Sequence, residues 1–336
     1  MREYELEVLE QYPIDVESTR KIRGAFFCDT DQGVTALREV HISRQRALYL
    51  YLLCKQLEES GYANVDTILP NAEGQLLSVS KDGRSYVLKR WYCGNECDVK
   101  NERDILMAVR NLAKLHVMMH WRGACSLEEH EEIVPPIGGN LAEIFARHNR
   151  ELTKVRKYVR SQPVKHEFEQ LFLKYFEKMY GQATTVTEKL KASSYEELYR
   201  MACENQTLVH GDYNYHNIIF MRNEIATTNF DRARVDVQVS DLAYFIRKVM
   251  EKQHWRVELG RKMMAAYIQI RPLSEMEKEY IFLRLSYPEK FWKTVNGYYL
   301  SNKSWISEKL VEKLQQTITE TEEKSGFLEQ IFTFLL

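Results

Sequence analysis

Features that would assign a protein to a membrane, to export or to nucleic acid are missing from this sequence. No apolar run approaches the ~20 residues of a membrane-spanning helix. The opening residues, MREYELEVLE, are acidic and polar, unlike the basic and then apolar pattern of a secretion signal. The 47 basic and 48 acidic residues nearly cancel, and aromatic base-stacking platforms are not evident. We therefore expect no membrane span, no secretion signal and no nucleic-acid partner.

Metal-ligand clusters and phosphate-binding glycine loops are also scarce. Cys93 and Cys97 lie close together, but no second Cys or His pair at ligand spacing completes a zinc site. Without an export signal, the thiols are expected to be reduced. Gly24, in RKIRGAFF, stands alone and is weak evidence for a glycine-rich loop. The six cysteines are Cys28, Cys54, Cys93, Cys97, Cys125 and Cys203.

The sequence does contain a change of pattern near residue 92. Before it, short apolar runs alternate with turn residues, and one helical run begins at the N-cap type Ser43 and stops at Gly61. After it, apolar residues recur at helical spacing. At 336 residues the chain is long enough for two packed lobes. The expected strands are 20–28, 33–40, 65–69, 76–80 and 85–91, and the main later helices are about 99–120, 140–160, 164–190, 194–203 and 305–324.

The most informative stretch lies between residues 208 and 245 and begins LVHGDYNYHNIIF. Asp212 is followed five residues later by Asn217, and an extended segment then supplies Asn229 and Asp231. Phosphoryl transfer uses this order: a carboxylate orients and deprotonates a hydroxyl, an amide oxygen holds Mg²⁺, and a nearby strand carries a second metal ligand. Asp212 is therefore the candidate catalytic base, and the other three residues are candidate metal ligands.

The word HGDxxxxN resembles the catalytic loop of the aminoglycoside phosphotransferase and choline kinase superfamily, which shares the protein kinase fold. The segments YPIDVESTRKIRGAFFCDTDQGVTALREV, NLAKLH and SDLAYFIRKVM are similar to the bacterial spore-coat CotS family. The resemblance implies an α+β, protein kinase-like, two-lobed fold. Its β-rich N-lobe would span residues 1–92 with a hinge at about 87–94. Its helical C-lobe would span 93–336, with the catalytic loop at 208–220 and a metal-strand segment at 225–231.

The resemblance also implies roles for single residues. His210 would brace the catalytic loop rather than transfer protons, and Asp241 would accept backbone N–H groups of that loop as a structural contact. His216 has no assigned role in the family. The hinge residues Arg90, Trp91 and Tyr92 would meet a nucleotide. ATP and Mg²⁺ are the implied cofactors if the protein is active, and none is implied otherwise.

Two residues compete for the position that pairs the nucleotide phosphates. Lys89, in YVLKRW, looks like the kinase strand motif, but it would leave no strands after the following helix to finish the lobe. Arg38, in TALREV, is followed by the helix that begins near Ser43 and then by further strands. Assigning Arg38 to this position, which we call the Arg38 register, gives every predicted strand and helix a place in the lobe. This assignment is favoured, although both alternatives stay open.

Under this register the sequence departs from active relatives at two positions. Arg38 stands where they carry lysine, and the helix of residues 43–57 holds no glutamate to pair with it. Asn229 stands where the family usually has Asp, and its amide brings no net negative charge for a hard cation. Asp231 would compensate if it shared a strand face with Asn229.

Two functional hypotheses follow. The first is a CotS-like spore-coat protein whose phosphotransfer is weak or lost, with other coat proteins as partners. The alternative is an active ATP/Mg²⁺-dependent kinase that phosphorylates a hydroxyl of a sugar, amino alcohol or aminoglycoside-like compound. Whether the protein is an enzyme is left open between them. By resemblance, it would arise in the mother-cell cytoplasm and be deposited in the spore coat.

Overall fold

The computed structural model describes residues 7–123, 132–222, 224–301 and 308–336, so Cys125 and the start of the helix expected at 305 lie outside the described residues. The chain forms two compact units. The sheet unit comprises Met1–Ile137 and Gln206–Val235, and the helical unit comprises Gly138–Asn205 and Asp236–Leu336. Because the sheet unit includes the catalytic loop, these units are not the two lobes expected from the sequence, and a lobe boundary near residue 92 stays a prediction.

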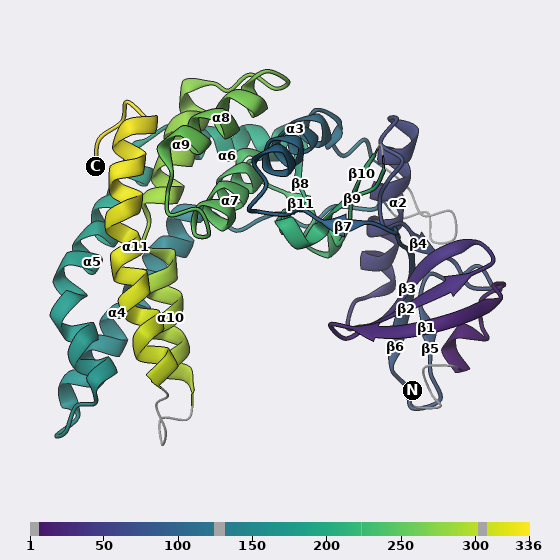
Figure 1. Cartoon of the computed structure of the whole chain (residues 1–336), viewed down its shortest axis with the longest axis horizontal. Coiled ribbons are helices and arrows are strands. Elements are labelled where there is room, and N and C mark those ends of the chain that lie inside the picture. The colour runs from purple at the N-terminus through teal and green to yellow at the C-terminus, as the bar shows by residue number, and fades with distance from the viewer. Residues whose placement is uncertain (1–6, 124–131, 223, 302–307) are drawn as a thin grey trace. The chain divides into compact units, whose positions relative to one another are not determined.

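An antiparallel sheet forms the first part of the sheet unit, with strand order β1-β2-β3-β6-β4 and β5 paired to β6 (Figure 1). Leu37 and Leu88 are opposite each other on β3 and β6, and both are fully buried. They pack with Phe26 and Tyr86 in an apolar cluster on this sheet. The strands are β1 Val16–Ile22, β2 Ala25–Thr30, β3 Gly33–Val40, β4 Ile68–Leu69, β5 Ser78–Val79 and β6 Ser85–Arg90.

The single strand expected at 20–28 is wrong, because the chain reverses direction inside it. Ile22 pairs with Ala25, and the two residues between them, Arg23 and Gly24, have φ of 49° and 83°. A two-residue turn with positive φ at both positions matches the twist of the strands that it joins. Gly24 therefore lies in a hairpin turn. The turn is hard to predict from the sequence because Arg23 stands where such turns usually have Asn.

Helix α2, Arg44–Glu59, begins as the sequence predicted. Ser43 has extended backbone angles, and its hydroxyl accepts a hydrogen bond from the backbone N–H of Arg46. The helix follows β3 and precedes β4. The order of strand, helix and further strands is thus the one that the Arg38 register required.

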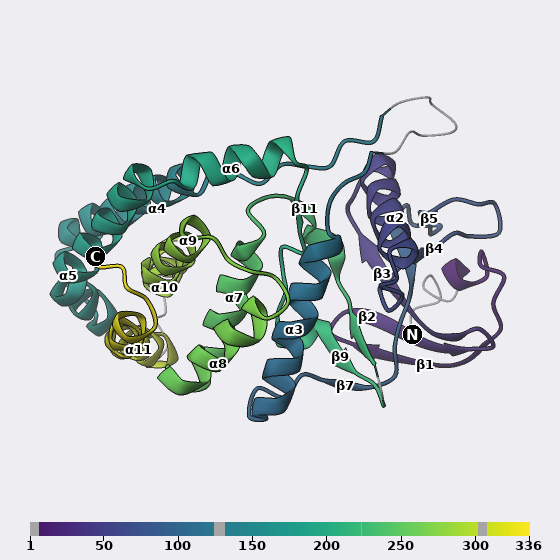
Figure 2. The ribbon, with the colours of Figure 1, turned by 90° about the horizontal axis from the view of Figure 1, so that it is seen from above.

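The rest of the sheet unit carries the catalytic loop beside helix α3, Glu102–Met118 (Figure 2). Buried Asn111 of α3 donates to the hydroxyl oxygens of Tyr213 and Thr227, and it accepts from Tyr62. These bonds fix the helix to both ends of the loop region. The strands here are β7 Asn95–Glu96, β9 Ile218–Phe220 and β10 Ile225–Thr227 in one sheet, and β8 Leu208–Val209 and β11 Arg234–Val235 in another.

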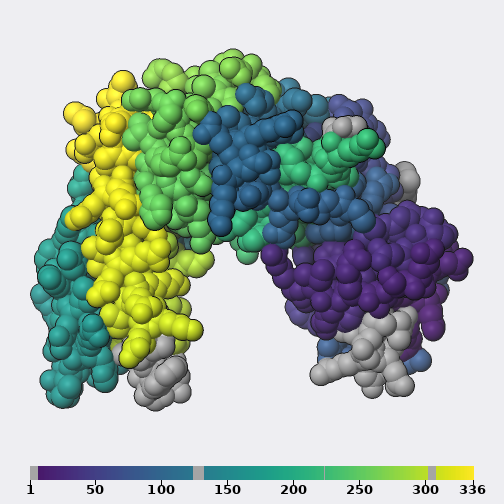
Figure 3. Space-filling view, viewed as in Figure 1, coloured from purple at the N-terminus to yellow at the C-terminus, as the bar shows by residue number. Residues whose placement is uncertain are grey.

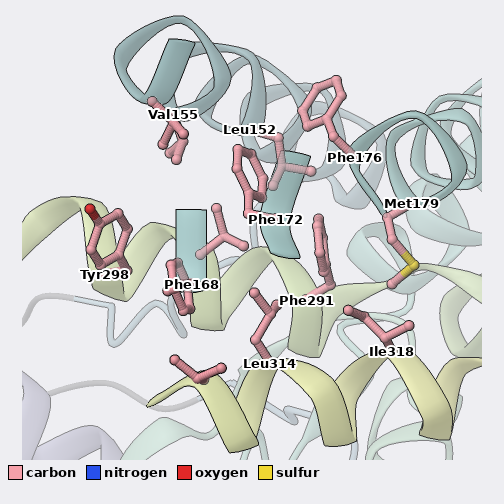
Figure 4. Close-up of a cluster of buried hydrophobic side chains, with 13 residues drawn as sticks. Leu152, Val155, Phe168, Phe172, Phe176, Met179, Phe291, Tyr298, Leu314 and Ile318 are labelled. Carbon is pink, nitrogen blue, oxygen red and sulfur yellow. The ribbon is translucent and has the colours of Figure 1, made fainter. Parts of the chain in front are cut away.

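The regular structure of the helical unit, within its described residues, consists of helices, and aromatic rings fill much of its core (Figure 4). Phe172 and Phe176 of α5 stack edge to face, and Phe291 of α10 packs against Phe172. Helix α11 lies alongside α5 at the surface of this unit (Figure 3). The helices are α4 Leu141–Ser161, α5 Glu167–Ala192, α6 Tyr195–Glu204, α7 Val239–Met250, α8 Val257–Ile268, α9 Glu275–Ser286, α10 Glu289–Leu300 and α11 Glu308–Ile331.

Among the described residues, no helix combines the length and the apolarity needed to cross a bilayer.

The helical unit also buries a cation, Lys324 of α11, whose ammonium donates to the backbone oxygen of Tyr287 at 3.1 Å. Burial and the neighbouring Arg247 lower the pKa of Lys324 to about 8, although nearby glutamates, Glu289 foremost, oppose this shift. Between pH 8 and the ordinary value of 10.5, the unfolded chain therefore holds a proton that the folded chain does not. The charged lysine lowers stability below about pH 8, and this cost disappears as the pH rises.

We predict that Lys324→Met stabilises the protein over wild type more at pH 7 than at pH 10, because methionine removes a cost that exists only while Lys324 is charged. Thermal unfolding at both pH values measures the difference. Lys313→Met, at an exposed position of the same helix, is the control and should show a difference that does not depend on pH. A Lys324→Met effect that is equal at both pH values would contradict the prediction.

Candidate functional site

The start of the catalytic loop is fixed by its backbone. Gly211 has φ of 79°, and a Cβ built there would collide with the carbonyl oxygen of Arg232, so glycine is required twice over. His210 is fully buried. Its Nδ1 accepts from the backbone N–H of Asp212 at 3.1 Å, and its Nε2 donates to the backbone oxygen of Thr228 at 2.9 Å. His210 therefore joins the loop to the segment after β10, and the bracing role expected for it stays a prediction.

Asp212, the candidate base, is half-buried. Its Oδ1 accepts from the side-chain amide of Asn214 at 3.0 Å, and its backbone oxygen accepts from the side chain of Asn217 at 2.8 Å. The bond from Asn214 orients the carboxylate and the bond from Asn217 holds the backbone, and a group that positions a hydroxyl needs such an orientation.

A chain of hydrogen bonds joins Arg38 to this loop through two of the three candidate metal ligands. Nη1 of Arg38 donates to Oδ1 of Asn229 at 2.8 Å. Nδ2 of Asn229 then donates to Oδ1 of Asn217 at 2.6 Å, and Nδ2 of Asn217 donates to the backbone oxygen of Asp212. Every bond runs in the same direction, so each amide orientation is set by its neighbours. We call this sequence of bonds the amide relay.

The expected strand through residues 225–231 ends early. β10 stops at Thr227, Asn229 has left-handed backbone angles with φ of 65°, and Phe230–Arg232 forms a short 3-10 turn. Asn229 and Asp231 consequently share no strand face, and the argument for compensation from strand alternation fails. Asparagine tolerates the left-handed conformation better than most residues, which suits it to this bend.

A buried ion pair that sequence reasoning missed lies behind the relay. Nζ of Lys89 is 3.0 Å from Asp66 and 2.6 Å from Asp231, and the side chains of Lys89 and Asp66 are 6% and 0% exposed. Asp66 also accepts from the backbone N–H of Asn229 at 2.9 Å. A signal was available, because Asp66 and Lys89 each interrupt an apolar strand candidate, and buried charges of opposite sign need partners.

The charges around Asp231 set its protonation. Burial alone would raise the pKa of Asp231, but the ammonium of Lys89 and the guanidinium of Arg38 together hold it below its ordinary value. Burial likewise disfavours the charge of Lys89, yet Asp66 and Asp231 raise the pKa of Lys89 above its ordinary value. Both groups are therefore charged at neutral pH.

A further arginine holds the turn from the other side. Nη2 of Arg46, in the first turn of α2, donates to the backbone oxygens of Asp231 and Ala233 at 2.7 and 3.0 Å. The one helix between β3 and β4 thus presents a cation to this segment, whereas the kinase pattern places a glutamate on that helix. Glu58, at its end, pairs with Arg90 and Lys55 instead.

The predicted ligands fit Mg²⁺ poorly in this arrangement. A hard cation bound there would have to displace or share the protein donors that these oxygens already accept. The side-chain oxygens of Asn217 and Asn229 both accept within the amide relay, and the two carboxylate oxygens of Asp231 accept from Lys89 and Arg38. Within the described part of the chain, no cluster of three or more Asp, Glu, His or Cys has a metal-binding arrangement. The guanidinium of Arg38 supplies a cation to these oxygens directly.

A cavity of about 700 Å³ in the sheet unit adjoins the relay. Arg38, Asn229 and Asn217 line it, as do the expected hinge residues Trp91 and Tyr92. Arg90 is not among the lining residues, since its side chain pairs with Glu58 at 3.0 Å. The other described lining residues are Arg20, Ile22, Arg23, Phe27, Cys93, Gly94, Glu96, Asn214, His216 and Ile219.

Two residues named from the sequence are not members of the amide relay. Asp241 is buried in the first turn of α7, in the helical unit, and its contact with the catalytic loop stays a prediction. His216, for which no role was expected, lines the cavity and bonds to Glu96 of β7.

Sequence comparison identifies the family. The family described as spore coat putative kinase YutH matches residues 5–331. The chain belongs to this family. A relative of the YutH-family chain, spore coat protein S of Bacillus subtilis (strain 168), is 24% identical over 332 residues, which cover 97% of this chain and 93% of the relative. The resemblance to spore-coat kinase-like proteins is confirmed.

Solved structures similar to the YutH-family chain include phosphotransferases. An aminoglycoside phosphotransferase from Alicyclobacillus acidocaldarius matches with a TM-score of 0.82 and 14% identity, covering 97% of this chain and 94% of that one. An amicoumacin kinase in complex with AMP-PNP, Ca²⁺ and Ami matches with a TM-score of 0.63 and 13% identity, covering 95% and 92%. At these identities the likeness shows the fold, and the predicted α+β, kinase-like fold is confirmed.

We predict that Lys89→Met lowers the free energy of unfolding by about 3–5 kcal/mol at pH 7, because it leaves the carboxylate of Asp66 buried without its partner. Calorimetry measures the loss. Lys89→Met/Asp66→Asn should recover part of it, since the orphaned charge is gone. Lys114→Met, at an exposed position of α3, is the control and should change stability by no more than about 0.5 kcal/mol. Equal stability of the two lysine variants would contradict the buried ion pair.

Proposed function

We propose that this YutH-family chain is a spore-coat protein that keeps the nucleotide cavity of a kinase-like fold and has weak or no phosphotransfer. The assignment to the coat is supported by the family and by the relative named spore coat protein S. Its partners are then other coat proteins. The protein would be made in the mother-cell cytoplasm and deposited on the forming spore.

The amide relay carries the proposal for weak or lost catalysis. Arg38 donates to Asn229 and Asp231, and Asn229 donates to Asn217, so the oxygens that would coordinate a metal already bind protein donors. Phosphoryl transfer depends on metal ions that bridge the phosphates and neutralise developing charge. Removal of one such preorganised contact typically costs ~10²–10³ in rate.

One observation favours the alternative of an active small-molecule kinase. The carboxylate of Asp212 is held by Asn214 and remains half-exposed, as a group that orients a substrate hydroxyl would be. The amicoumacin kinase structure holds AMP-PNP and Ca²⁺, which supports ATP and Mg²⁺ as the cofactors in that case. The substrate would be the hydroxyl of a sugar, amino alcohol or aminoglycoside-like compound.

We predict that the wild-type protein turns over ATP far below the ~1–100 s⁻¹ of kinases, and that Arg38→Lys/Asn229→Asp gains Mg²⁺-dependent binding of ATP. Aspartate at 229 would place a carboxylate oxygen against Oδ1 of Asn217, where the structure has a 2.6 Å N–H···O bond. Two oxygens at such a distance need a cation between them. ATP hydrolysis, and transfer to amino alcohols and aminoglycosides, measure turnover, and thermal midpoints with and without Mg²⁺ measure binding.

Asn205→Asp, at the C-terminal end of α6 in the helical unit, is the control for the added charge and should gain no Mg²⁺ dependence. Wild-type turnover at an ordinary kinase rate, abolished by Asp212→Ala, would overturn the proposal and establish the active kinase.

A further inference from the structure

The cavity next to the amide relay has an excess of positive charge. Arg20 of β1, Arg23 of the β1–β2 turn and Arg38 of β3 line it, and Glu96 is the one acidic residue among its described lining residues. Among these four residues, three positive charges and one negative charge leave an excess of two. A pocket with this balance favours an anionic ligand.

Each of the three arginines already contacts a carboxylate. Arg20 lies 3.0 Å from Asp29, and Arg38 lies 3.1 Å from Asp231. A guanidinium carries five N–H donors, so an arginine that donates one or two of them to a carboxylate still presents others. The side chains of Arg20 and Arg23 are 49% and 62% exposed, which leaves room for a second acceptor.

The same cavity has an apolar wall for a planar ring. Phe27 and Trp91 meet edge to face with centroids 5.1 Å apart, and Ile219 of β9 also lines the space. A Cβ at Gly94 would collide with the backbone oxygen of Phe220, so the chain passes β9 at the closest approach that a glycine allows. A ligand with a flat apolar part and an anionic part matches these two surfaces.

We propose that this cavity binds a nucleoside polyphosphate without a divalent cation, with Arg23 and Arg38 supplying the positive charge that a metal ion supplies in active kinases. The inference rests on the proposed function, in which the nucleotide cavity is kept and the metal position is closed. Guanidinium groups are suited to this role because they stay charged and bind phosphate oxygens in a bidentate manner.

Glu96 reduces the attraction of the cavity for an anionic ligand, because it pairs with Arg23. Burial opposes its ionisation, but hydrogen bonds from His216 and Arg23 hold the pKa of Glu96 below its ordinary value, so it is charged at neutral pH. Nη1 of Arg23 lies 2.6 Å from Oε1 of Glu96. The carboxylate therefore competes with phosphate for the guanidinium, and its neutralisation should strengthen binding.

Cys93 provides a readout that does not depend on catalysis. It is exposed and lines the cavity, whereas Cys28, Cys54 and Cys97 are buried. Cys203, partly exposed in the helical unit, is the internal control. The intact protein is treated with iodoacetamide in EDTA, with ATP, inorganic triphosphate or adenosine, and alkylation of each cysteine is followed by mass spectrometry.

We expect ATP in EDTA to slow alkylation of Cys93 and leave that of Cys203 unchanged. Inorganic triphosphate should compete with ATP, and adenosine should bind more weakly. Arg23→Gln should weaken ATP binding by about tenfold or more, the loss of a hydrogen bond to a charged group. Glu96→Gln should tighten it, and Arg110→Gln, at an exposed position of α3 outside the cavity, should not alter it.

Three results would overturn the inference: protection by ATP only when Mg²⁺ is present, no protection by ATP at millimolar concentration, or equal protection by adenosine and ATP with no effect of Arg23→Gln. Arg23 lies outside the amide relay, so Arg23→Gln reports on binding without disturbing the bonds of Arg38 to Asn229 and Asp231. Turnover assays test the proposed function separately. ATP binding in EDTA without turnover supports both the loss of phosphotransfer and metal-free binding. Turnover together with Mg²⁺-dependent binding refutes both.

Discussion

The buried ammonium of Lys89 is the interaction on which the site depends. It forms ion pairs with both Asp66 and Asp231, and these two residues bind the backbone of Asn229 and the guanidinium of Arg38. Removing a charge from water is costly and is offset only when its partners are complete. The bend after β10, the position of Arg38 and the orientation of Asn229 are therefore coupled through one lysine, which itself does not line the cavity.

This coupling changes how the two departures from the kinase pattern are understood. Considered singly, arginine for lysine and asparagine for aspartate each weaken a catalytic contact. Together they form a matched pair, because the amide oxygen of Asn229 accepts from Arg38 and its amide nitrogen donates to Asn217. An aspartate could not donate in that bond. In the proposed function, the two residues form a hydrogen-bonded arrangement, which satisfies their polar groups, where active kinases would hold a metal ion.

Local patterns predicted much of this architecture. The start of helix α2 was predicted correctly from the N-cap at Ser43 and the helical spacing of apolar residues. The order of strand, helix and strand around Arg38 was also predicted correctly. The failures arose where tertiary contacts decide. The turn at Arg23 and Gly24 lacks the usual turn sequence, and the left-handed bend at Asn229 is fixed by Asp66, 163 residues away. The ion pair between Asp66 and Lys89 requires knowledge of which strands are adjacent, which periodicity does not contain.

The intact HGDxxxxN motif is not by itself evidence for catalysis, since most of its named residues have structural roles. His210 joins two segments through its ring nitrogens, Gly211 permits a close backbone contact, and Asn217 closes the loop onto the backbone of Asp212. Each would be retained in a protein that never transferred a phosphate, because its loss would open the loop. The carboxylate of Asp212 differs from these groups because it is partly exposed as well as bonded to the side-chain amide of Asn214. Contact between that carboxylate and a substrate hydroxyl is therefore the feature that distinguishes a working kinase from a kinase fold used as a coat component.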